Sequence, residues 1–235
     1  MRKNKRPSLE SILDKDFHYF MEYDYDTVTN CAEEGCDEEG ICRCGRLENF
    51  RITKVNIVEI AKEFCKLAED EFTKYCIHRA VFACKLWDPE AWTKSISMSY
   101  YGEEVDYIKM HSSAQNELRR VLSEILSVKS NKEKLFIVLE KEYGYLLPEL
   151  KEQDHFGIIT VEPKEIHAGS KDHYKKLEPE FVCQYEDYDL AIGVGLRREG
   201  GIKLLDGYHR LAAKDRCRHV GIIVGEKVWK KSPNI

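Results

Sequence analysis

The most constraining feature of this sequence is the stretch 200–213, GGIKLLDGYHRLAA, where an apolar run, a glycine and a helix-forming segment follow one another. The alternating apolar residues up to Leu205 predict a short strand. Gly207 predicts a tight turn, because glycine adopts positive φ without strain. The residues from Tyr208 onward predict the first turn of a helix. We therefore expect a strand–turn–helix junction at this point.

A junction of this kind is suited to an anionic ligand. The first backbone N–H groups of the helix and the positive end of its dipole face whatever lies above the turn. Gly207 allows close approach of the backbone, Arg210 offers a planar fork to two phosphate oxygens, and His209 can donate to phosphate or transfer a proton. Asp206 can cap the helix, orient His209 or hold a metal ion. The alternative is an ordinary capped helix with Arg210 in solvent.

The signature Asp206-Gly207-Tyr208-His209-Arg210 resembles that of the ParB/sulfiredoxin superfamily, whose members bind nucleotide phosphates at a strand-to-helix turn. The apolar runs 190–196 and 220–224 resemble the family's strands before and after the signature. Sulfiredoxins have a catalytic cysteine where this chain has Tyr208, so sulfinic acid reduction is disfavoured. Partition proteins continue into a DNA-binding helical domain, whereas 25 residues follow Arg210 here, which disfavours that role too.

The resemblance implies a set of site residues. The polar loop within 163–177 corresponds to the substrate side of the family's pocket, and an exposed loop is the alternative. A carboxylate near this loop, Asp172, Glu178 or Glu180, would act as the base. The predicted catalytic residues are His209, Arg210, Asp206 and Asp172, and the predicted ligand-binding residues are Gly207, Tyr208, His209, Arg210, Lys203, Lys171, Ser170 and His173.

Four cysteines lie within fourteen residues: Cys31, Cys36, Cys42 and Cys44. A zinc ion takes four tetrahedral nitrogen or sulfur ligands, and glycines between these cysteines permit tight turns. Five acidic residues in the same stretch would oppose thiolates unless a cation were present. The pattern predicts a structural Zn²⁺ site. A hairpin with reduced thiols is the alternative, because the spacing is not that of a standard zinc ribbon.

Charge is distributed unevenly. The segment 196–235 holds ten Lys and Arg against four acidic residues, a net of +6, which leaves −11 for residues 1–195. A basic region on an acidic body favours a localised anionic ligand and leaves nucleic acid as a second partner class. There is no apolar run long enough to span a membrane and no apolar signal core after the basic N-terminus, so we expect a cytoplasmic protein with no membrane partner.

The pattern of elements predicts an α+β fold in three segments. Residues 1–55 hold a short helix from Ser8, an aromatic packing run, the cysteine knuckle and a strand at 47–55. Residues 56–148 form a helical scaffold with helices at 56–83, 112–128 and 131–143 and a hairpin at 92–110. Residues 149–235 form the ParB/sulfiredoxin-like α/β domain, beginning with a strand at 156–161.

Together these features predict a nucleotide-binding protein that uses ATP, ADP or CTP with Mg²⁺, as a phosphotransferase or a nucleotide hydrolase. Two alternatives stay open. One is a nucleic-acid-binding or nuclease-like protein, and the other is a non-catalytic module that senses a phosphate-bearing ligand. The nucleotide, the acceptor and the oligomeric state are left open by the sequence.

Overall fold

The computed structural model confirms an α+β fold with a mixed sheet. The residues that the structure describes are 6–15, 17–24, 51–86, 112–167, 189–214 and 216–227. The chain divides into two compact units: Met1–Leu67 with Ile77–Ser123, and Ala68–Cys76 with Glu124–Ile235. The three predicted segments and their boundaries stay predictions.

The first unit begins with helix α1 (Leu9–Leu13), which Ser8 caps by accepting a hydrogen bond from the Ser11 amide. The turn η1 (His18–Phe20) leads into strand β1 (Met21–Asp24), which pairs antiparallel with β2 (Arg51–Val55). The predicted packing role of the aromatic run is met by Phe17, which is buried and stacks on Phe64, whereas Tyr19 is exposed.

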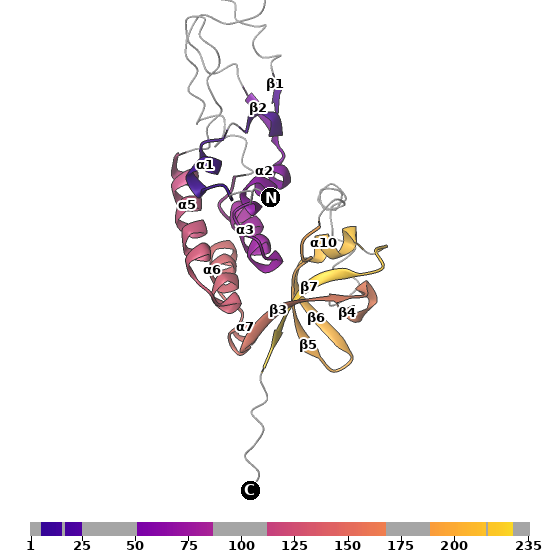
Figure 1. The fold of residues 1–235 in the computed structure, drawn as a ribbon. Coiled ribbons are helices and arrows are strands. Elements are labelled where there is room, and N and C mark those ends of the chain that lie inside the picture. Colours follow the sequence, from indigo (N-terminus) through magenta and orange to yellow (C-terminus); the bar gives the residue numbers. More distant parts are fainter. Residues whose placement is uncertain are drawn as a thin grey trace, which may run out of the picture. The chain divides into compact units, whose positions relative to one another are not determined.

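One long helix was predicted over 56–83, and this prediction is wrong. The structure has α2 (Ile57–Cys65) and α3 (Glu71–Ala83) instead (Figure 1). The Asn56 side chain caps α2 on the Glu59 amide, as the sequence predicts. A second cap begins α3, because the Asp70 carboxylate accepts hydrogen bonds from the amide and the hydroxyl of Thr73. An aspartate in this position favours a helix start over a continued helix.

The helices predicted at 112–128 and 131–143 are present as α5 (Ser112–Ser127) and α6 (Asn131–Tyr143). Ser130 caps α6, and Gly144 ends it in the left-handed conformation with φ of 73°. A short helix, α7 (Pro148–Lys151), follows. No helix in the described part of the chain is both long and apolar enough to cross a membrane.

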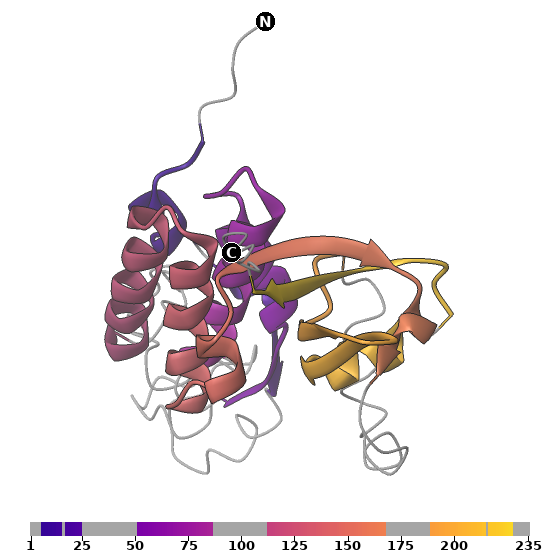
Figure 2. The same cartoon turned by 90° about the horizontal axis from the view of Figure 1, so that it is seen from below.

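The second unit contains a five-stranded sheet in the order β3-β7-β5-β6-β4. Its strands are β3 (His155–Val161), β4 (Ile166–His167), β5 (Val194–Arg198), β6 (Gly201–Asp206) and β7 (Val220–Glu226), with the turn η4 (Pro163–Glu165) between β3 and β4. Strands β3 and β7 pair antiparallel along their whole length (Figure 2). Strand β5 pairs parallel with β7 and antiparallel with β6, and β6 pairs parallel with β4.

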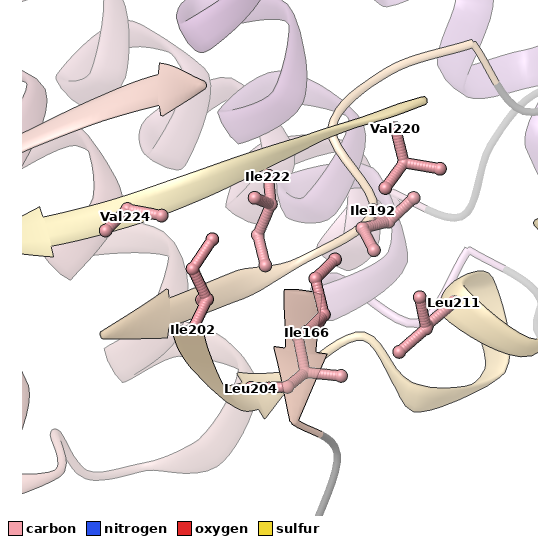
Figure 3. Close-up of a cluster of buried hydrophobic side chains, with 8 residues drawn as sticks. All are labelled: Ile166, Ile192, Ile202, Leu204, Leu211, Val220, Ile222 and Val224. Atoms are coloured by element: carbon pink, nitrogen blue, oxygen red, sulfur yellow. The ribbon is translucent and has the colours of Figure 1, made fainter. Parts of the chain in front are cut away.

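The core of this unit lies between one face of the sheet and the short helix α10 (Tyr208–Ala213) (Figure 3). Alternation along β6 turns Ile202 and Leu204 into the core and leaves Lys203 exposed, as a strand period of two requires. Leu211 brings α10 onto the same cluster. The buried residues of the cluster are Ile166, Ile192, Ile202, Leu204, Leu211, Val220, Ile222 and Val224.

Candidate functional site

The predicted strand–turn–helix junction is present at the end of β6. The strand ends at Asp206, Gly207 has φ of 107° and ψ of 22°, and α10 begins at Tyr208. No side chain caps this helix, because its N-cap residue is a glycine. The Leu211 amide donates to the Gly207 carbonyl, which closes the first helical turn.

Gly207 is needed for contact between two parts of the backbone. A Cβ atom at Gly207 would collide with the Ile192 carbonyl oxygen and would lie 2.8 Å from the Gly193 Cα. A Cβ at Gly193 would collide with the Asp206 carbonyl oxygen. The sequence suggests that Gly207 makes room for a ligand, whereas in the structure the nearest atoms belong to the chain segment leading into β5. Positive φ adds a second reason for glycine at this position.

Arg210 is buried, with its side chain 7% exposed. Its Nε donates to the Ile192 carbonyl oxygen at 2.5 Å, and its Nη2 donates to Asp206 Oδ2 at 2.8 Å. The sequence predicts a guanidinium fork offered to phosphate. The structure instead gives this guanidinium two partners within the protein, which tie α10 to β6 and to the segment before β5.

Asp206 is the centre of this network. Besides the bond from Arg210, its Oδ1 accepts a hydrogen bond from the Tyr143 hydroxyl at 2.7 Å, and its Oδ2 lies 3.5 Å from the Tyr75 hydroxyl. Burial of a carboxylate is costly unless it is paired and hydrogen-bonded, and these partners provide that compensation. The sequence did not indicate Tyr75 or Tyr143, since neither spacing nor motif connects them to the signature.

This network also bears on the predicted metal role of Asp206. The guanidinium of Arg210 compensates the negative charge of this carboxylate, which gives Asp206 a structural role in the turn. Among the described residues, no group of three or more His, Cys, Asp and Glu side chains is placed to hold a metal ion. The metal role of Asp206 stays a prediction.

The remaining predicted residues of the junction differ in exposure. His209 is exposed on the first turn of α10. Tyr208 is half-buried against the core, and its hydroxyl donates to the Leu204 carbonyl oxygen at 3.3 Å. Lys203 is exposed and forms an ion pair of 2.9 Å with Glu149. Of the predicted ligand-binding side chains in the described chain, His209 and Lys203 are exposed, and Lys203 is paired with Glu149.

Several predicted residues lie outside the described part of the chain. They are the loop residues Ser170, Lys171, Asp172 and His173 and the cysteines Cys31, Cys36, Cys42 and Cys44. Their roles in ligand binding, proton transfer and zinc binding stay predictions.

The positive charge of the C-terminal segment is partly compensated. Besides Lys203, Arg197 pairs with Glu226 at 3.0 Å and Lys227 pairs with Glu152 at 2.8 Å. The hydrogen bond from Lys227 and its charge hold the pKa of Glu152 below its ordinary value. Arg216 and Arg218 are exposed in the turn after α10. Two of these pairs, Lys203–Glu149 and Lys227–Glu152, join the basic segment to acidic residues before it, whereas Arg197–Glu226 lies within the segment.

Comparisons with protein families, with curated proteins and with solved structures found no match to this chain. The resemblance to the ParB/sulfiredoxin superfamily rests on the signature and on the order of elements around it.

Proposed function

We propose that this chain binds a phosphate-bearing ligand, in the first instance a nucleotide, at the junction 206–210. The observation that carries the proposal is the uncapped start of α10, where a glycine N-cap precedes the exposed His209. The positive end of the helix dipole lies at this turn, where a negative charge is stabilised. The resemblance to a nucleotide-binding superfamily supports the same ligand class.

In this proposal the buried and exposed residues have separate tasks. Arg210 and Asp206 hold the turn in shape through their contacts with each other and with Ile192. His209 and the backbone of the turn contact the phosphate. Turnover of the nucleotide, as a phosphotransferase or hydrolase, would need a proton acceptor, for which Asp172, Glu178 and Glu180 are the candidates from the sequence. Binding without turnover corresponds to the sensing module.

The test is calorimetric titration of the full chain with ATP, ADP and CTP. We expect His209→Ala to weaken binding by about tenfold, the effect of one lost charge-assisted hydrogen bond. His155→Ala is the matched control, because His155 is also exposed but lies at the start of β3. Equal affinity of the wild type and His209→Ala, or no binding of any of the three nucleotides, would contradict the proposal. Release of phosphate from the bound nucleotide would show turnover. Binding without release of phosphate corresponds to the sensing module.

A second candidate is nucleic-acid binding, which the exposed Arg216 and Arg218 favour. Phosphate contacts by such residues give affinity that falls steeply with salt. Replacing both arginines by alanine should reduce the slope of log affinity against log salt by about two. Affinity for DNA and RNA that is weak and independent of salt would remove this candidate.

A further inference from the structure

A cavity of about 210 Å³ lies in the second unit, next to the end of β6. Its walls are mainly aliphatic and come from α6, from the segment around α7 and from strands β5 and β6. Its described lining residues are Leu139, Tyr143, Tyr145, Leu146, Leu147, Leu150, Val194, Leu205, Asp206 and Tyr208. Mostly apolar concave sites with a few polar groups are typical of small-molecule binding. The volume is below that of a site for a drug-sized compound, which indicates a ligand of one or two rings.

The charge of the lining indicates a neutral ligand. Asp206 is the single charged side chain among the described lining residues, and Arg210 compensates it at 2.8 Å. An ionised ligand would lose its hydration without gaining a counter-charge at the apolar walls, and that loss is costly. A neutral molecule avoids this cost and gains from covering leucine side chains.

Three tyrosines line the cavity, and two of them are exposed. Tyr143 and Tyr145 are 44% and 62% exposed, and their ring centroids lie 6.4 Å apart with the planes tilted by 52°. Tyr208 adds a third ring that is half-buried. Tilted and offset ring contacts stabilise aromatic ligands beyond the area they bury. Two exposed tyrosines beside an apolar cavity therefore favour a ligand that is itself aromatic.

We propose that this cavity binds a small neutral aromatic compound of one or two rings. The cavity shares Asp206 and Tyr208 with the junction 206–210 but does not include His209, the side chain that the proposed function assigns to the phosphate. The two proposals can therefore fail separately. A ligand in the cavity would contact Tyr143 and Asp206. It would therefore touch the hydrogen-bond network that fixes the side chains of the signature 206–210.

The test uses indole as the probe and ¹⁵N–¹H NMR spectra of the full chain as the readout. We expect saturable shifts of the amides of residues 143–147, 149–150 and 205–208. Indole-3-carboxylate should bind at least about tenfold more weakly, because it buries a charge. Tyr145→Ala should weaken indole binding by about three- to tenfold through loss of a ring contact. Tyr19→Ala is its control, because Tyr19 is exposed in the other unit.

A second variant fills the cavity. Leu205→Trp should abolish the indole shifts, whereas Leu126→Trp, at an exposed leucine of α5 outside the lining, should leave them unchanged. The spectra of the variants also report whether each is folded. If Leu205→Trp does not fold, the effect of Tyr145→Ala on indole binding decides, because Tyr145 is exposed and its replacement should leave the fold intact. The proposal is overturned if the wild type gives no saturable shifts up to the solubility of indole. Equal binding of indole and indole-3-carboxylate, or unchanged binding by Leu205→Trp or Tyr145→Ala, overturns it as well.

Discussion

Tyr143 donates a hydrogen bond of 2.7 Å from its phenolic oxygen to Asp206, a residue 63 positions further along the chain. The bond connects the last residue of α6 to the last residue of β6, within one compact unit. Because Asp206 in turn accepts from Arg210, the end of a helix outside the signature helps to fix the side chains of the signature. The shape of the turn therefore depends on residues that no local motif contains.

The first prediction concerns this bond. Tyr143→Phe removes the hydroxyl donor and keeps the ring. It should lower the free energy of unfolding by about 1 kcal/mol, which is less than a buried hydrogen bond to a charged group contributes, because Tyr143 is 44% exposed. Urea unfolding measures the change. Tyr145→Phe is the matched control, because Tyr145 is a neighbouring, exposed tyrosine. Equal midpoints for the two variants would show that the bond to Asp206 adds nothing to stability.

The second prediction concerns the contact between Gly193 and Gly207. Alanine at Gly207 combines a positive φ with a collision against the Ile192 carbonyl, and alanine at Gly193 collides with the Asp206 carbonyl. Gly207→Ala should cost at least about 2 kcal/mol of unfolding free energy, since strained backbone and overpacking each cost about 1 kcal/mol or more, and Gly193→Ala, which adds only the collision, about 1 to 3 kcal/mol.

Gly157→Ala provides the control for both glycine variants. Gly157 lies in β3, and a Cβ there would have no atom within 4 Å. Alanine at this position should be neutral or stabilising by up to about 1 kcal/mol, because it restricts the unfolded chain. A loss of stability in Gly157→Ala as large as in Gly207→Ala would mean that glycine content, and not the backbone contact, determines the result.

Local patterns were sufficient to predict most elements. The bounds of α6 and the cap of α2 on Asn56 followed from apolar spacing and capping residues, and the signature predicted the turn after β6. The break between α2 and α3 was missed, because apolar residues continue at helical spacing through it. The Asp70–Thr73 pair was the available signal, since an aspartate three residues before threonine is typical of a helix start.

The site was predictable only in part. Gly207, His209 and Arg210 lie at the turn as expected, but the burial of Arg210 depends on contacts with Ile192 and Asp206 that only the folded chain creates. Tyr75 reaches Asp206 from 131 residues away, and no periodicity connects residues across such a separation. The cavity likewise depends on the packing of α6 and α7 near β5 and β6.

The third prediction concerns the ion pair between Arg210 and Asp206. Arg210→Met keeps much of the volume but leaves Asp206 without its cationic partner in a site where both side chains are mainly buried. The unfolding free energy should fall by about 3 to 5 kcal/mol, the cost of breaking a buried pair from one side. The double variant Arg210→Met with Asp206→Asn should recover part of this loss, because no uncompensated charge remains. The single variant Asp206→Asn completes the comparison. If the loss in the double variant equals the sum of the losses in the two single variants, the two side chains are not energetically coupled.

The fourth prediction concerns pH and the cap of α3. Burial raises the pKa of Asp70, but hydrogen bonds from the Thr73 hydroxyl and amide and the charge of Lys134 outweigh it, so the pKa is below its ordinary value of 3.8. A carboxyl group whose pKa is lower in the folded state stabilises the fold above its unfolded pKa, and this contribution is lost as the pH falls through the folded pKa. Stability should therefore decrease more steeply below about pH 4 in the wild type than in Asp70→Asn.

Urea midpoints measured from pH 3 to pH 7 test this, with Glu69→Gln as the control for an exposed acidic neighbour. Parallel pH profiles of the wild type and Asp70→Asn would mean that the cap works equally well without its charge.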